Sequence, residues 1–321
     1  MASANAKLIL VDGFAGSGKS TAAQRLWLNL VRGGRDATWV HEHEADHPVF
    51  EYGEVEELLR LTERSFEERL LTGWSTTARQ VDPPAVRIIE GSFFQIPVGV
   101  MLSMNVPAVR IRALLRRIES TISRLDVSLI YLFQPDLRAA LLRVGNDRGV
   151  QWLEAMTAAV GQSAYGRAHR VRNVGGLIEY YRRQRAVIDS VFPRLTVRRL
   201  AIDVSGGRWD RYERQMTRFL GIRQAPPIEL RPADLLRHVG SYRGATEGKG
   251  CVITTDAHTL YMHMPSTSVQ RLVRVSDGHF CVQSLPIDVR FTCDRKGQVR
   301  RFEYESRMAN EILRDTTWSR A

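Results

Sequence analysis

A glycine-rich segment at residues 13–20, GFAGSGKS, constrains the fold of this chain more than any other feature. It satisfies the pattern G-x-x-x-x-G-K-[ST], and Thr21 follows it. The apolar run at 7–11 before it is typical of a buried parallel strand, and residues 21–32 after it carry apolar side chains at helical spacing. A strand, a glycine loop and a helix in this order predict phosphate binding, because backbone N–H groups can turn inward around an anion at a helix N-terminus.

The loop predicts a site for a nucleoside triphosphate, with ATP and Mg²⁺ as the expected cofactors. In such a loop the lysine reaches the β- and γ-phosphates and the hydroxyl that follows it ligates Mg²⁺, which assigns these roles to Lys19 and Ser20. The expected nucleotide-binding residues are Gly13, Ala15, Gly16, Ser17, Gly18, Lys19, Ser20 and Thr21.

Strand-like and helix-like segments alternate through the first two thirds of the chain. Apolar runs predict further strands at 37–40, 85–89, 127–133 and within 195–204, and periodic segments predict helices at 53–74, 107–125, 135–144 and 209–220. This alternation indicates an α/β fold, a parallel five-stranded sheet with helices on both faces. Ligands then bind beyond the carboxyl ends of the strands.

A change in composition divides the chain into two expected domains. Residues 1–222 form the P-loop domain, and the proline-rich stretch 223–232 is a linker. Residues 233–321 hold short β-rich runs separated by turns, at 251–255, 259–264, 271–275, 279–283, 289–293 and 299–304. This spacing predicts a small antiparallel β domain, a sheet or an open barrel, with an accessory role in binding or packing.

Composition narrows the class of protein. Of the 321 residues, 44% are hydrophobic and 25% charged, which is ordinary for a soluble protein. The apolar stretch 93–106 is interrupted by polar residues, proline and glycine and is too short to span a bilayer, and the N-terminal apolar run is not a signal peptide. An odd number of cysteines (Cys251, Cys281 and Cys293), without metal spacing, favours reduced thiols and a cytoplasmic location.

The net charge of +11 comes mostly from arginines scattered along helices. No stacking aromatics or nucleic-acid motif accompany them, so solvated helix faces and an anionic substrate explain the charge better than a nucleic-acid surface. Nucleic acid is therefore an unlikely partner. A homodimer stays open.

Carboxylates follow two of the expected strands, where a kinase needs a Mg²⁺ ligand and a base. Glu90 follows the third strand and is the predicted magnesium-side or catalytic carboxylate. Glu42 and Glu44 follow the second strand, and alternation points them to the same side, so either can serve as the base. We favour Glu44.

Arginines near the glycine-dotted segment between the fourth and fifth strands are suited to a lid that stabilises developing phosphate charge. Arg143 and Arg148 are the predicted members of the site. By contrast, His43-Glu44-Ala45-Asp46-His47 matches H-E-x-x-H but follows a β-like run and meets Pro48, which disfavours the helix that a zinc site of this type requires.

Taken together, these residues resemble the P-loop nucleoside and nucleotide kinases, among them thymidylate kinases and deoxynucleoside kinases. The resemblance covers about residues 7–220 and includes LIYLFQPD at 129–136, followed by Arg143 and Arg148. It implies that the base is Glu42 or Glu44. In deoxynucleoside kinases the third strand ends in Glu-Arg-Ser, whereas this chain has Glu90-Gly91-Ser92 and lacks the arginine.

Residues from Leu235 onward resemble the small β domain appended to some serine β-lactamase-like enzymes, although no Ser-x-x-Lys nucleophile accompanies them. The sequence therefore predicts an ATP- and Mg²⁺-dependent phosphotransferase acting on a small-molecule hydroxyl or phosphate acceptor. The alternatives are a P-loop ATPase or nucleotide-dependent switch whose β domain binds a partner, and a nucleic-acid end kinase.

Overall fold

The computed structural model describes residues 7–50, 61–81, 85–226, 228, 231–245, 249–264, 267–309 and 316–321. The chain divides into two compact units. The first takes in Met1–Trp27, Asp36–Glu42 and His47–Ile222, and the second takes in Leu28–Arg35, His43–Asp46 and Arg223–Ala321. In the described residues, no helix is both long enough and apolar enough to cross a bilayer.

A five-stranded parallel sheet forms the centre of the first unit and confirms the predicted fold class. Its strands are β1 (Lys7–Gly13), β2 (Ala37–Val40), β3 (Val86–Glu90), β4 (Asp126–Phe133) and β5 (Arg198–Asp203). Their order in the sheet is β2-β3-β1-β4-β5, and each neighbouring pair is parallel. The inner strands are almost entirely buried, which explains why they appear in the sequence as continuous apolar runs.

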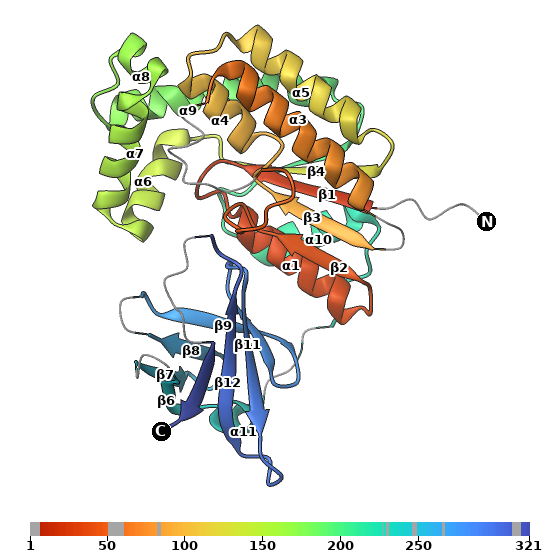
Figure 1. Ribbon diagram of the computed structural model, residues 1–321, viewed down its shortest axis with the longest axis vertical. Coiled ribbons are helices and arrows are strands. Elements are labelled where there is room, and N and C mark those ends of the chain that lie inside the picture. Colours follow the sequence, from red (N-terminus) through yellow and green to blue (C-terminus); the bar gives the residue numbers. More distant parts are fainter. Residues whose placement is uncertain are drawn as a thin grey trace, which may run out of the picture. The chain divides into compact units, whose positions relative to one another are not determined.

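Helices cover both faces of this sheet (Figure 1). They are α1 (Lys19–Arg32), α3 (Glu63–Gln80), α4 (Gln95–Ser103), α5 (Ala108–Ile122), α6 (Leu137–Arg148), α7 (Val150–Gln162), α8 (Ala164–His169), α9 (Val174–Val191) with the short 3₁₀ turn η1 (Phe192–Arg194), and α10 (Trp209–Leu220). Leu8 and Leu10 of β1 join the core on the side of α3, α4, α5 and α9. Ile9 and Val11 alternate to the face of α1 and α10.

Several helices differ from their predicted positions. The helix expected at 53–74 is α3 at Glu63–Gln80, which Thr62 caps, and residues 51–60 lie outside the described part. Helix α4 was not predicted, because Pro97 and Gly99 interrupt an apolar run that packs into the core along most of its length. The stretch expected as a glycine-dotted lid contains α7, α8 and α9 as well as α6.

The second unit contains a closed eight-stranded antiparallel barrel rather than the open form expected. Its members are β6 (Gly240–Gly244), β7 (Gly250–Thr255), β8 (Leu260–His263), β9 (Gln270–Ser276), β10 (His279–Val282), β11 (Ile287–Cys293), β12 (Val299–Ser306) and β13 (Thr317–Arg320), preceded by the short helix α11 (Pro232–Leu236). The unpredicted strands β6 and β13 pair with each other and close the barrel. Phe302 and Trp318 stack in its core with ring centroids 5.8 Å apart.

Candidate functional site

The loop after β1 packs tightly between two helices. Gly16 and Gly18 have φ of +76° and +81°, where a side chain is strained. A Cβ on Gly16 would lie 1.9 Å from Cγ2 of Val144 on α6, and one on Gly18 would lie 2.2 Å from Cη2 of Trp209 on α10. The glycines of the motif are therefore required both for the backbone conformation and for the close approach of α6 and α10.

The loop leads directly into the first turn of α1, which begins at Lys19. The amide of Ser17 donates to the carbonyl of Phe14 at 3.0 Å, which closes the turn. The hydroxyl of Ser17 is buried and has no hydrogen-bond partner among the described residues. A buried polar atom without a partner is costly, so this hydroxyl is consistent with a loop that binds a polar ligand.

The lysine of the motif is buried beside a carboxylate. Lys19 is only 4% exposed, and its Nζ lies 3.4 Å from Oε2 of Glu42. Gln95, the first residue of α4, donates from Nε2 to the same Glu42 oxygen at 2.9 Å. Glu42 follows β2 by two residues, so the carboxyl ends of β1 and β2 and the start of α4 meet at this cation.

A second carboxylate meets the hydroxyl of the motif. Ser20 donates to Oε1 of Glu90 at 2.7 Å, the indole of Trp39 donates to Oε2 at 3.1 Å, and Nε2 of His41 lies 3.4 Å from Oε1. Glu90 is completely buried. Burial, reinforced by the negative charge of Glu42, raises the pKa of Glu90 from 4.5 to about 8, although Lys19, Ser20 and Trp39 oppose this rise.

The oxygens of Ser20 and Glu90 are the type of ligand that Mg²⁺ prefers, and they lie together beside the lysine of the loop. The described residues contain no cluster of three or more histidine, cysteine, aspartate or glutamate side chains suited to a metal. A Mg²⁺ ion here would therefore take most of its ligands from phosphate and water, as is usual for this ion at phosphate sites.

Asp12 is a buried carboxylate that the sequence analysis missed. Its two oxygens accept the amides of Gly13, Phe93, Phe94 and Gln95 at 2.7–3.0 Å, which ties the end of β1 to the start of α4. Burial raises the pKa of Asp12 to about 6 in spite of these hydrogen bonds. Its place at the last residue before the glycine loop was the available signal, since polar residues at strand ends mark a ligand edge.

Glu44, the predicted base, lies in a segment grouped with the second unit. Its Oε2 lies 3.4 Å from Nε of Arg307, and its backbone forms an isolated bridge with Met308. The stretch from His43 to His47 forms turns rather than a helix, and the His47 ring stacks on Phe50.

The two predicted arginines are exposed on α6, the helix whose Val144 packs against the loop. The guanidinium of Arg148 lies 5.4 Å from the ring centroid of Trp152. Burial raises the pKa of Tyr181, and the nearby charges of Arg148 and Glu42 also act on this hydroxyl.

Gly91 follows Glu90, where the sequence resemblance to deoxynucleoside kinases implies an arginine. Its φ is +66°, and a Cβ there would lie 2.5 Å from Oε2 of Glu42 and 3.5 Å from Cε of Lys19. A side chain at this position would therefore be strained in the backbone and would have to displace the Glu42 carboxylate.

No family model matches the chain, and no curated protein matches it. Three solved structures align with 67–68% of it: the thymidylate kinase of Candida albicans (14% identity, 92% of that chain, TM-score 0.43), the YorR protein of Bacillus subtilis in complex with phosphorylated GDP (16%, 95%, 0.40), and the deoxyadenosine kinase of M. mycoides with bound dATP (14%, 99%, 0.42). Each TM-score is below 0.5. The resemblance to a β-lactamase-associated β domain finds no support in these comparisons and stays a prediction.

Proposed function

We propose that this chain is a Mg²⁺-dependent kinase that transfers the γ-phosphoryl group of ATP to a small-molecule hydroxyl or phosphate acceptor of the nucleoside or nucleotide type. The observation that carries the proposal is the pairing of the motif with two carboxylates, Lys19 with Glu42 and Ser20 with Glu90. A loop that served only as a turn would not need a buried lysine and two acidic strand ends beside it.

In this proposal the loop from Gly13 to Thr21 binds the phosphates through its backbone N–H groups, and Lys19 neutralises the β- and γ-phosphates. Ser20 and Glu90 hold Mg²⁺. The bound ion supplies positive charge that offsets the negative charge of the phosphates during transfer. Because burial favours the protonated form of Glu90, this carboxyl group would have to lose its proton in order to act as a metal ligand.

Glu42 is the residue that we assign as base, in preference to Glu44. Its carboxylate lies 3.4 Å from the ammonium of Lys19, where the transferred phosphoryl group would be bound, whereas Glu44 is paired with Arg307. Next to it, Oε1 of Gln95 is buried without a hydrogen-bond partner among the described residues. Gln95 is therefore the residue proposed to hydrogen-bond the acceptor.

Gly91 leaves the site without the arginine of the Glu-Arg-Ser motif. We assign its charge-stabilising role to Arg143 and Arg148, because α6 packs against the glycine loop and both residues are solvent-accessible.

The first test is a transfer assay. The protein is incubated with ATP or GTP, Mg²⁺ and a panel of nucleosides and nucleoside monophosphates, and phosphorylated products are detected by mass spectrometry. We expect little hydrolysis without an acceptor and rapid transfer with the right one. Steady hydrolysis that no acceptor changes would instead favour an ATPase or switch. No heat on calorimetric titration with either nucleotide would contradict phosphate binding altogether.

The second test compares Glu42→Gln with Glu44→Gln, two equal changes two residues apart. Loss of a general base is expected to lower kcat about 10²- to 10⁴-fold in Glu42→Gln, with unchanged turnover in Glu44→Gln. The reverse pattern would return the role to Glu44.

A further inference from the structure

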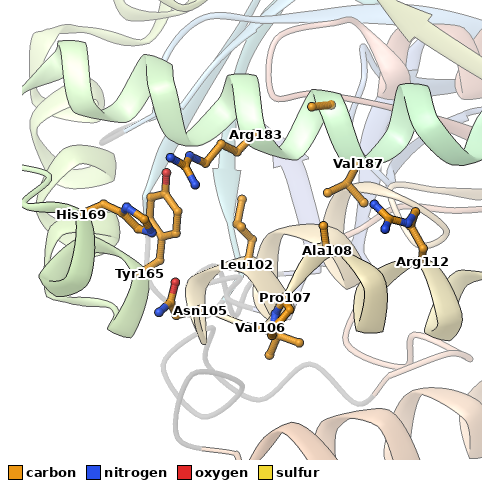
Figure 2. Close-up of a pocket in the computed structure, with 11 residues that line it drawn as sticks. Leu102, Asn105, Val106, Pro107, Ala108, Arg112, Tyr165, His169, Arg183 and Val187 are labelled. Carbon is orange, nitrogen blue, oxygen red and sulfur yellow. The ribbon is translucent and has the colours of Figure 1, made fainter.

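A pocket of about 430 Å³ lies among the helices of the first unit. It is bounded by the end of α4, the start of α5, α8 and α9, and Figure 2 shows its lining. Cavities of 300–1,000 Å³ are the size that small-molecule ligands occupy, so this one has room for a ring-sized body.

The pocket is separate from the proposed transfer site, although both touch α4. Gln95 at the start of α4 donates to Glu42, whereas the pocket meets the other end of the helix, at Leu102 and Asn105. Nine residues of α-helix span about 13 Å. Between the two ends the hydroxyl of Tyr180 donates to the carbonyl of Gly99 at 2.7 Å, which packs α9 against α4. Glu42 and the pocket thus lie at opposite ends of α4.

The chemistry of the lining is divided between an apolar middle and polar ends. Leu102, Val106 and Val187 are buried and form the middle. Arg183, Tyr165, His169 and Asn105 gather at one end, and Arg112 lies at the other (Figure 2). A ligand that fits has an apolar body and a polar group at one end at least.

The arginines at the two ends of the pocket differ in their partners. Nε of Arg183 lies 3.7 Å from Oε1 of Glu179, and the guanidinium carbon of Arg183 lies 5.7 Å from the ring centroid of Tyr165. Arg112 has no ion pair or hydrogen bond with any described residue. Two other arginines of α5 are paired, Arg110 with Glu63 and Glu67 and Arg117 with Glu67. Arg112 is thus a cation on the pocket wall whose charge is left for a ligand.

We propose that this pocket is a second ligand site, which binds a small organic anion with an apolar body. Its acid group lies against Arg112, and its body packs on Leu102, Val106 and Val187. The start of α5 is compatible with this orientation, because Pro107 precedes it without a side-chain cap and the N-terminal end of a helix favours negative charge. The site does not depend on the phosphotransfer reaction proposed above.

The probe for this site is 1-anilinonaphthalene-8-sulfonate, an organic anion with an aromatic body, titrated by fluorescence with and without ATP and Mg²⁺. We expect one saturable site, about tenfold weaker binding in Arg112→Ala, and loss of the signal in Ala186→Trp, which fills the pocket from its exposed rim. The matched control is Arg116→Ala, one turn further along α5 and outside the lining, which should bind like the wild type. Uncharged N-phenyl-1-naphthylamine, which has the same body, should bind more weakly than the sulfonate.

Equal affinities for Arg112→Ala and Arg116→Ala would overturn the proposal, because the acid group would then not be held at Arg112. Retention of the full signal in a folded Ala186→Trp variant would also overturn it, by placing the probe elsewhere. These readouts measure binding alone, so they stay distinct from a failure of the transfer assay.

Discussion

The carboxyl edge of the parallel sheet and the interior of the barrel are both buried, but they bury different chemistry. The sheet edge encloses Asp12, Lys19 and Glu90, each no more than 4% exposed. The barrel encloses a cluster built largely of apolar and aromatic side chains, among them Phe302 and Trp318.

This difference in buried chemistry suits the sheet edge to binding a ligand and the barrel interior to stabilising the fold. Burying ionisable groups costs free energy unless partners compensate, so the sheet edge is a place where a phosphate and a metal ion can add stabilisation. Packed rings stabilise the fold without a ligand. Substitutions at the sheet edge should therefore mainly change binding and turnover, and those in the barrel should mainly change unfolding.

The largest effect is expected for Lys19→Ala. Loss of the cation at the phosphates should lower turnover by at least about 10²- to 10³-fold, while the circular dichroism spectrum stays that of the wild type. Arg25→Ala, a change on the same helix at a partly exposed ion pair, is the control and should retain activity. Wild-type turnover in Lys19→Ala would show that the sheet edge does not serve catalysis.

In the barrel, Phe302→Ala should cost about 3–5 kcal/mol of unfolding free energy, because it opens a cavity beside Trp318. Chemical denaturation followed by fluorescence measures this loss, and nucleotide affinity at the loop should change little. Arg301→Ala, on the outer face of the same strand, should stay within about 0.5 kcal/mol of the wild type. Similar losses in both variants would show that the interior is not the source of stability.

A smaller effect is expected for Gly91→Ala. A positive φ costs a residue with a side chain about 1–2 kcal/mol, and the new methyl group would also displace the Glu42 carboxylate. Gly207→Ala separates the backbone cost from the displacement of Glu42. Gly207 has a similar φ of +64°, and nothing lies within 4 Å of its Cβ position. Kinetics should show a fall in turnover for Gly91→Ala alone. Equal turnover in the two variants would mean that Glu42 does not need its present position.

A pH dependence of stability is also expected from Glu90. Its pKa is raised to about 8 in the fold against 4.5 in the unfolded chain, so the native state binds more protons between these values. The stability that Glu90 contributes is therefore present below about pH 4.5 and lost as pH rises to about 8. Thermal unfolding at a series of pH values should show that the unfolding temperature falls less steeply with rising pH in Glu90→Gln than in Glu154→Gln, a control at an exposed site.

Much of the sheet was predictable because buried parallel strands leave long apolar runs and because the glycine loop fixes what surrounds it. Helix α10 was predicted at Trp209–Leu220, where the structure has it. The different surroundings of Glu42 and Glu44 were not predictable. Strand alternation stops at the end of β2, at Val40, and the turns that follow separate two side chains that alternation would have placed together.

Closure of the barrel could not be predicted either, because it depends on the pairing of β6 with β13, two short strands far apart in the chain. Such long-range pairing depends on the rest of the barrel and leaves little periodic signal of its own. The role of Asp12 depends on amides about 80 residues away, a relation that no local pattern records.

The close approach of Trp209 to Gly18 has a practical consequence. The indole of Trp209 packs directly against Gly18, since a Cβ built on Gly18 would lie 2.2 Å from its Cη2. A change in the electric field or the hydration of the glycine loop should therefore alter the emission of this indole. Trp209 is one of six tryptophans, and the indole of Trp39 also lies in the site, on Glu90, so the emission of the unlabelled protein is expected to report a bound charged ligand from both rings. The difference between the wild type and Trp209→Phe isolates the contribution of Trp209.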